Sequence, residues 1–150
     1  MTPTRWTIWI ALALYVAALG ARPASRLRQW AWTLGCLFYL AHVAAAFHFY
    51  HHWSHAAAYQ HTARRTAEVM GLDWGGGLYW NYAFTLVWLG DVIWMWLRLR
   101  RPRWAGAAVQ GFLAFMVFNA TVVFETGPIR WLGLAATVGL LSTLLIRRRR

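Results

Sequence analysis

The chain has 150 residues, of which 60% are hydrophobic, 17% aromatic and only 13% charged, with a formal net charge of +11. A soluble domain carries roughly 25% charged residues, and a single domain of this length cannot hide several long apolar helices from water. The composition therefore excludes an ordinary soluble domain and predicts an all-α integral membrane protein, with one membrane domain over residues 1–150.

Five apolar runs follow one another along the chain. The middle three have about the 20 residues that a helix needs to cross a bilayer, and the first and last are near the lower limit of about 17. We therefore expect a polytopic bundle of five transmembrane helices over residues 6–20, 30–50, 78–97, 104–124 and 131–146. The first run has only Arg5 as a positive flank and no clean small-x-small cleavage site, so it is expected to be retained. Its removal as a signal peptide would leave four spans.

Basic residues gather on one side of the predicted bundle. They follow the first and third spans and end the chain, as Arg22, Arg26, Arg28, Arg98, Arg100, Arg101, Arg103 and Arg147 to Arg150. The positive-inside rule then places the N-terminus outside and the C-terminus inside, in a bacterial inner membrane. We expect these arginines to contact anionic lipid head groups. A nucleic-acid partner is excluded, because no soluble module carries a basic face.

The connection over residues 51–77 is the only long one, and it lies on the outer side. Residues 51–70 contain strong helix formers and neither Pro nor Gly, so they either continue the second span as one helix or bend into an interfacial helix. Gly71 is the expected end of that segment. The run Gly75-Gly76-Gly77 predicts a turn into the third span.

Tryptophan is unusually frequent, with 12 residues. Most lie at span ends, where an interfacial anchoring role is sufficient. Trp88, Trp94 and Trp96 are more central. They are candidates for lining a quinone, lipid or heme pocket, although packing against lipid is the simpler interpretation.

All six histidines fall between His42 and His61, at the outer end of the second span. On a continuous helix, positions 48, 51, 52 and 55 share one face. Imidazoles three or four residues apart can reach one metal ion from adjacent turns. The predicted primary metal ligands are His48, His51, His52 and His55, and the candidates to complete the site are His61, Glu125, Asp73 and Glu68. Such a mixed nitrogen and oxygen set suits iron, copper or zinc.

The strings HxxHH and HxxxH within His48–His55 resemble the histidine boxes of membrane fatty-acid desaturases and hydroxylases. The resemblance implies a site for two irons. It covers these eight residues only. Those enzymes carry further histidines in separate boxes along much longer chains, whereas here the boxes overlap.

Heme b has few possible axial ligands in this chain. The first, third, fourth and fifth predicted spans contain no histidine, so ligation by two histidines from facing helices requires a partner subunit. A single axial His is the other possibility. The absence of a CxxCH motif excludes attached c-type heme.

Polar residues inside the predicted spans form a second group of candidates. Asp91 lies alone in the third span and is a functional candidate by default, with an ion pair to Arg98 or Arg28 as the competing interpretation. His42 and Asp91 could contribute to a proton path, although they differ in depth. Asn119 is a candidate to hydrogen-bond His42 or to orient a ligand histidine.

These observations lead to three functional hypotheses. The first is a metal-binding histidine cluster at the outer, periplasmic membrane surface, used for redox or metal-assisted chemistry. The second is a small accessory subunit of a larger respiratory or redox membrane complex, or a homo-oligomer. The third is a proton-coupled transport module built on His42 and Asp91. The sequence leaves open whether the protein is an enzyme, and no Ser-His-Asp pattern supports covalent catalysis.

Overall fold

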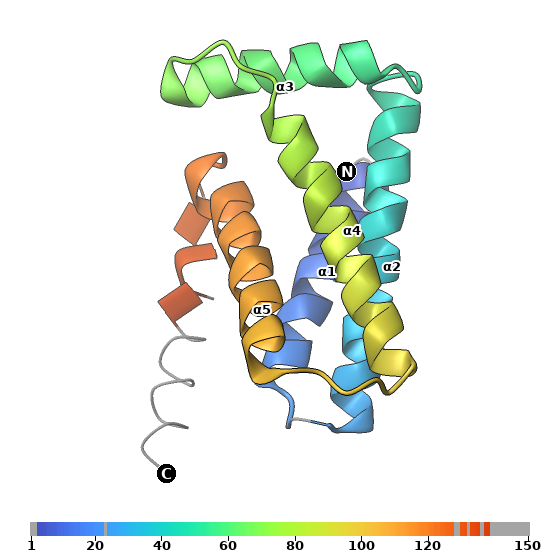
Figure 1. Ribbon diagram of the computed structural model, residues 1–150. Coiled ribbons are helices and arrows are strands. Elements are labelled where there is room, and N and C mark those ends of the chain that lie inside the picture. Colours follow the sequence, from blue (N-terminus) through green and yellow to red (C-terminus); the bar gives the residue numbers. More distant parts are fainter. Residues whose placement is uncertain (1–2, 23, 128–129, 132, 136, 139–150) are drawn as a thin grey trace.

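The protein is a helical bundle with one helix lying across its end (Figure 1). The computed structural model describes residues 3–22, 24–127, 130–131, 133–135 and 137–138, and all regular structure among them is helical. The helices that run along the bundle are α1 (Pro3–Gly20), α2 (Arg26–Phe49), α4 (Gly77–Trp96) and α5 (Arg103–Phe118). The crossing helix is α3 (His55–Met70), and α5 continues into a π-helical segment, η1 (Asn119–Val123).

Two helices among the described residues, Arg26–Phe49 and Arg103–Val123, are long and apolar enough to cross a membrane. Helix α1 is apolar but shorter. Helix α4 has 20 residues, and its Asn, Asp, Trp and Tyr side chains lower its mean hydropathy. The first four predicted spans coincide with α1, α2, α4 and α5 extended by η1. The fifth, residues 131–146, lies largely outside the described residues, although those described between 130 and 138 are helical.

Local signals begin and end the helices, and the predictions for Gly71 and for the Gly75–Gly77 turn are confirmed. Ser25 caps α2 by accepting a hydrogen bond from the Arg28 backbone N–H, with 3.2 Å between the two atoms. Gly71 ends α3 in the left-handed conformation, with φ at +73°, which a glycine adopts without a steric penalty. The Gly75–Gly77 segment forms the expected turn into α4, closed by a 3.1 Å hydrogen bond from the Leu78 N–H to the Gly75 carbonyl.

A sharp turn separates α2 from α3. Helix α2 ends at Phe49, and α3 begins at His55 after a cap by Ser54. Within the turn His52 has φ at +48° and Trp53 has φ at +60°, a left-handed conformation that costs roughly 1–2 kcal/mol for each residue that is not glycine. Of the two expectations for residues 51–70, the bent helix is therefore the observed one. The premise that positions 48, 51, 52 and 55 share one helical face is wrong, because the backbone changes direction between them.

The core is a cluster of aromatic rings around Trp88, whose exposed fraction is only 2%. Its indole packs with ring centroids 5.3–5.7 Å from those of Tyr15, Trp32, Tyr39 and Phe84, which come from α1, α2 and α4. Gly35 on α2 makes this packing possible, because a Cβ there would lie 3.1 Å from Trp88 Cζ2. Trp88 thus joins α4 to both α1 and α2.

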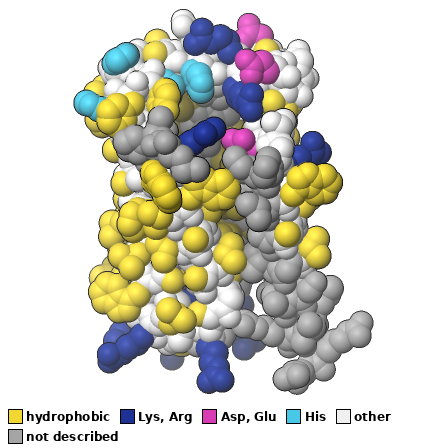
Figure 2. Space-filling view, turned by 180° about the vertical axis from the view of Figure 1, so that it is seen from behind, with side chains coloured by type: hydrophobic (Ala, Val, Ile, Leu, Met, Phe, Trp, Pro, Cys, Tyr) yellow, Lys and Arg dark blue, Asp and Glu magenta, His cyan; other side chains and the backbone are white. Residues whose placement is uncertain are grey.

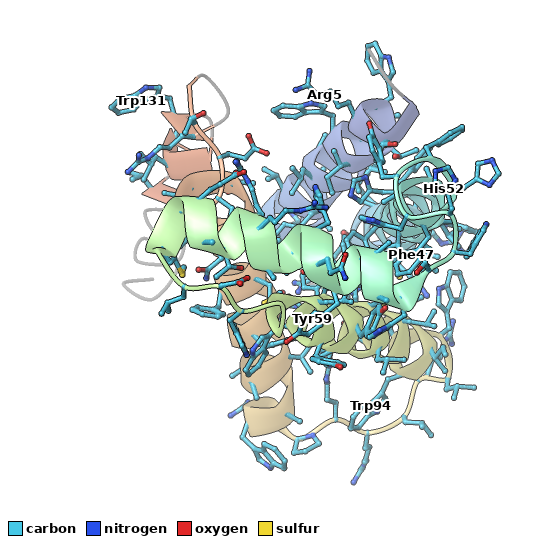
Figure 3. All side chains as sticks on the ribbon, turned by 90° about the horizontal axis from the view of Figure 1, so that it is seen from above. Arg5, Phe47, His52, Tyr59, Trp94 and Trp131 are labelled. Carbon is cyan, nitrogen blue, oxygen red and sulfur yellow. The ribbon has the colours of Figure 1, made fainter. Side chains whose placement is uncertain are left out.

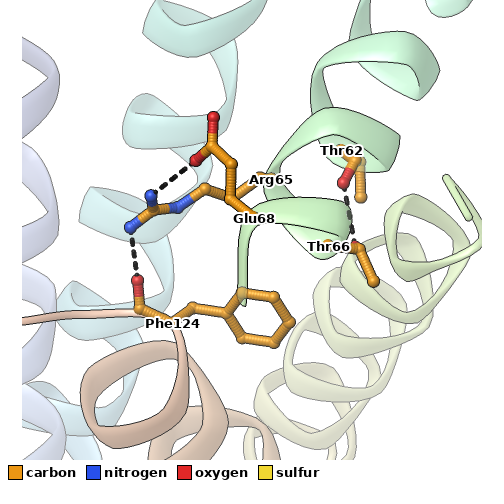
Figure 4. Close-up of polar contacts among 5 residues, drawn as sticks. All are labelled: Thr62, Arg65, Thr66, Glu68 and Phe124. Carbon is orange, nitrogen blue, oxygen red and sulfur yellow. Dashed lines mark hydrogen bonds and ion pairs between the residues drawn. The ribbon is translucent and has the colours of Figure 1, made fainter. Parts of the chain in front are cut away.

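Side-chain types are layered along the bundle. Figure 2 shows hydrophobic side chains over its middle, histidine and acidic side chains at the end that carries α3, and arginines at both ends. Arg65 holds α3 in place: its Nη2 donates to the Phe124 carbonyl at 2.7 Å, and its Nη1 pairs with Glu68 at 2.9 Å (Figure 4). Helix α3 is therefore tied to the end of η1 as well as to α2.

The contact between Gly35 and Trp88 predicts a strong effect of bulk at position 35. Gly35→Leu should lower the free energy of unfolding by about 1–3 kcal/mol, because its side chain overlaps the indole and the Leu14 side chain. Thermal unfolding in detergent measures the change. The matched control is Gly111→Leu on α5, where a Cβ meets nothing within 4 Å, and stability should be unchanged or slightly higher. Equal effects of the two variants would contradict this account of the core.

Candidate functional site

The turn between α2 and α3 distributes the histidines over three elements. His48 lies exposed in the last turn of α2, His51 and His52 lie in the turn, and His55 and His61 lie on α3. His52 lies at the edge of the molecule when it is seen from above (Figure 3). By folding α3 back across the bundle, the turn brings His51 to His61, with 5.3 Å between their ring centroids. His61, which the sequence suggests only as an additional ligand, is therefore the direct neighbour of His51, one of the predicted primary ligands.

His51 has the environment of a neutral imidazole. Partial burial lowers its pKa from the ordinary value of 6.5, and the nearby His61 and His52 lower it further through their like charge. The ring is therefore deprotonated at neutral pH. Since metal ions bind imidazole only in its neutral form, His51 is ready to act as a ligand.

The remaining predicted ligands do not join this pair in a group of three. Glu68 is engaged with Arg65, and Asp73 is exposed in the loop between α3 and α4. Glu125 lines a cavity beside α1. The His55 ring lies 5.9 Å from each of the rings of Tyr79 and Tyr82. In the part of the chain that the structure describes, no three His, Cys, Asp or Glu side chains come close enough together to hold a metal ion.

Asp91 forms a polar centre near the opposite end of the bundle. Its exposed fraction is 5%, and its Oδ2 accepts a 2.9 Å hydrogen bond from Trp32 Nε1. Its Oδ1 pairs with Arg101 from the loop between α4 and α5, and the Arg101 guanidinium stacks over Trp94 at 5.3 Å. The structure therefore has the ion pair that the sequence offers as one alternative, but with Arg101 in place of Arg98 or Arg28. Sequence reasoning missed both Arg101 and Trp32, because only the packed helices bring them to Asp91.

The structure separates the two residues of the suggested proton path. His42 Nδ1 lies 2.9 Å from the Thr4 carbonyl on α1. Asp91 meets α2 at Trp32, which precedes His42 by about 15 Å along the helix axis. The two side chains therefore have no direct contact. Asn119 donates to the Phe115 carbonyl within its own helix, at 2.8 Å.

Two polar sites stand out at opposite ends of an apolar bundle: the imidazole pair of His51 and His61, and the Asp91–Arg101 pair. The first has groups that bind metals, and it lies at the surface. In the second, opposite charges from α4 and the following loop pair with each other, as in a structural ion pair. No protein-family model, curated protein or solved structure matches the chain.

The Asp91–Arg101 pair predicts non-additive effects on stability. Asp91→Ala alone should lower the free energy of unfolding by roughly 3 kcal/mol, because it leaves a guanidinium without its partner in a largely buried site. Arg101→Ala should have a similar effect, and the double variant should lose less than the sum of the two.

Chemical unfolding of the detergent-solubilised variants gives this double-mutant cycle. Arg100→Ala is the control, since Arg100 is an exposed residue of the same loop and its loss should change little. Strictly additive losses would contradict the pairing.

Proposed function

We propose that this chain is a five-span integral membrane protein that binds a transition metal ion at its outer surface through His51 and His61. In this arrangement α1, α2, α4 and α5 with η1 are four of the spans, and residues 131–146 supply the fifth. Helix α3 lies along the outer membrane surface. The N-terminus is outside, the C-terminus is inside, and the histidines face the periplasm.

The layering of side chains supports this orientation. The loop joining α1 to α2 carries Arg22, and the loop joining α4 to α5 carries Arg98 and Arg100. Both loops lie at the end of the bundle away from α3, and both are segments that the sequence places inside. The end that carries α3 holds the histidines and three of the four acidic residues. An apolar middle between two polar ends is what a bilayer requires, and the arginine-rich end belongs inside.

The spacing of His51 and His61 is the observation that carries the metal site. A tetrahedral zinc ion with Zn–N distances near 2.0–2.1 Å places the centroids of two coordinating imidazoles about 5 Å apart. The observed separation of 5.3 Å agrees with this geometry. The lowered pKa of His51 also favours metal binding, because the neutral ring is the form that binds a metal ion. Imidazole nitrogen suits zinc, copper and iron.

Two protein ligands leave coordination positions open. Water, a substrate or the same pair from a second chain would fill them. Open positions are what metal-assisted chemistry requires. Two histidines from each of two chains would instead make a closed tetrahedral set, and that case agrees with the alternative role as a subunit of a membrane assembly.

The metal proposal predicts that two of the six histidines dominate binding. Titration of the detergent-solubilised protein with Zn²⁺ by calorimetry should show saturable binding near neutral pH. His51→Ala and His61→Ala should each weaken it by about tenfold or more, since even the loss of an outer hydrogen-bond partner of a ligand costs that much.

His48→Ala is the matched control, because His48 is an exposed histidine on the neighbouring helical turn. It should leave the affinity unchanged. Retention of full affinity in the His51→Ala/His61→Ala double variant would overturn the proposal. So would a loss in His48→Ala as large as that in His51→Ala.

A further inference from the structure

A cavity of about 420 Å³ lies at the end of the bundle away from α3, where the α1–α2 loop and the α4–α5 loop are found (Figure 1). Its wall comes from the start of α2, the last turns of α4, the loop between α4 and α5, and α5 itself. Small-ligand sites usually have volumes of about 300–1,000 Å³. The cavity therefore has room for a small polar head group.

The cavity is lined by more positive than negative side chains: Arg28, Arg98 and Arg101 against Asp91. Arg101 and Trp32 both engage the Asp91 carboxylate, so its charge is already offset. In the part of the chain that the structure describes, neither Arg28 nor Arg98 is paired with an acidic side chain. Arg28 is half-buried and Arg98 is exposed, so an ion from outside the protein can reach both side chains. The cavity thus carries positive charge that no acidic side chain neutralises.

Two of the arginines are close enough to repel each other. Burial lowers the pKa of the Arg101 guanidinium from its ordinary value of 12.5, and the like charge of Arg28 lowers it further. An anion between the arginines would offset this repulsion, because opposite charges a few ångströms apart attract.

The backbone around the cavity has two features that agree with an anion site. The first turn of α2 contains no acidic side chain, and the N-terminal end of a helix carries a partial positive charge. Ala24 and Arg98 both line the cavity and have φ at +60° and +52°, a left-handed conformation that residues other than glycine rarely adopt. Strained positions of this kind gather at ligand-binding sites. One of them lies in each of the two loops beside the cavity.

We propose that this cavity binds the phosphate group of an anionic ligand between Arg28 and Arg98, with Arg101 and the start of α2 adding to the attraction. Arginine suits phosphate because its planar guanidinium can donate two parallel hydrogen bonds to phosphate oxygens. In the proposed membrane arrangement the cavity lies at the inner surface, where anionic phospholipids present this group. A soluble phosphate would present the same group. The site does not depend on a metal ion at His51 and His61, which lie at the opposite end of the bundle.

Two lipids that differ in the phosphate group test the proposal. Dioleoyl-phosphatidylglycerol and dioleoylglycerol share their acyl chains, but only the first has a phosphate. Native mass spectrometry of the full-length protein, freed of co-purified lipid in a neutral detergent, counts the lipids bound to each protein molecule. Phosphatidylglycerol should bind at one saturable site about tenfold or more tightly than dioleoylglycerol, the factor expected for a charge-assisted hydrogen bond.

Inorganic phosphate, titrated by calorimetry into the same lipid-free protein, distinguishes the two sources of the phosphate group. Saturable binding of inorganic phosphate would show that the phosphate group alone is sufficient. Binding of phosphatidylglycerol without binding of inorganic phosphate would identify the lipid as the source. Both results support the proposal. If phosphatidylglycerol binds no more tightly than dioleoylglycerol and inorganic phosphate does not bind, the proposal is overturned.

Arginine variants locate the phosphate within the cavity. Arg28→Gln and Arg98→Gln should each weaken binding of the phosphate-bearing probe about tenfold, because each removes a charged hydrogen-bond donor. The matched controls are Arg26→Gln on α2 and Arg100→Gln in the α4–α5 loop, which remove the same charge from exposed neighbours that do not line the cavity. The controls should leave the affinity nearly unchanged. Losses in the controls as large as those in the cavity variants would contradict the proposal.

Two further measurements on these variants separate a lost site from a lost fold and from the metal proposal. Thermal unfolding in detergent should give Arg28→Gln and Arg98→Gln the wild-type unfolding temperature, since neither arginine is paired with an acidic side chain among the described residues. Zinc affinity should also be unchanged in both variants. Phosphate binding can therefore fail while zinc binding is intact, and zinc binding can fail while phosphate binding is intact.

Discussion

The close approach of Trp88 to Gly35 is the contact on which the bundle depends. Because position 35 has no side chain, the indole lies against the α2 backbone and also reaches the ring of Tyr15 on α1. Three helices therefore meet at one residue, and their aromatic rings form the core. The same packing buries the Tyr15 hydroxyl and the indole N–H without hydrogen-bond acceptors.

Helix α3 is the second organising element, since it places the histidines. It could not lie across the bundle without the left-handed turn at His52 and Trp53, whose conformational cost must be offset elsewhere. The bond from Arg65 to the Phe124 carbonyl anchors the other part of the helix. The turn and the Arg65 bond together hold α3 in the position in which His61 lies beside His51. A metal ion bound by both imidazoles would hold the turn closed and add stability to it.

Much of the helical structure was predictable from the sequence, because apolar runs and glycines are local signals. The helices α1, α2, α4 and α5, the Gly71 helix end and the turn before α4 agree with those signals. The site was less predictable. Helical periodicity placed four histidines on one face, but the turn after Phe49 interrupts that periodicity, and no local pattern reveals two non-glycine residues with positive φ. The partners of Asp91, Trp32 and Arg101, come from segments that are distant in sequence, so only the packed structure identifies them.

In the proposed arrangement, α1, α2, α4 and α5 cross a bilayer and α3 lies on its outer surface. The single cysteine of the chain, Cys36, is first replaced by alanine. Single spin labels introduced in this Cys36→Ala background, reconstituted in lipid vesicles, test the arrangement by collision with oxygen and with a water-soluble nickel chelate. Labels replacing Leu37 on α2 and Phe115 on α5, which are 54% and 60% exposed, should be reached by oxygen and shielded from nickel. A label replacing Gln60 on α3 should be open to nickel. Ready access of nickel to positions 37 and 115 would contradict the membrane-spanning arrangement.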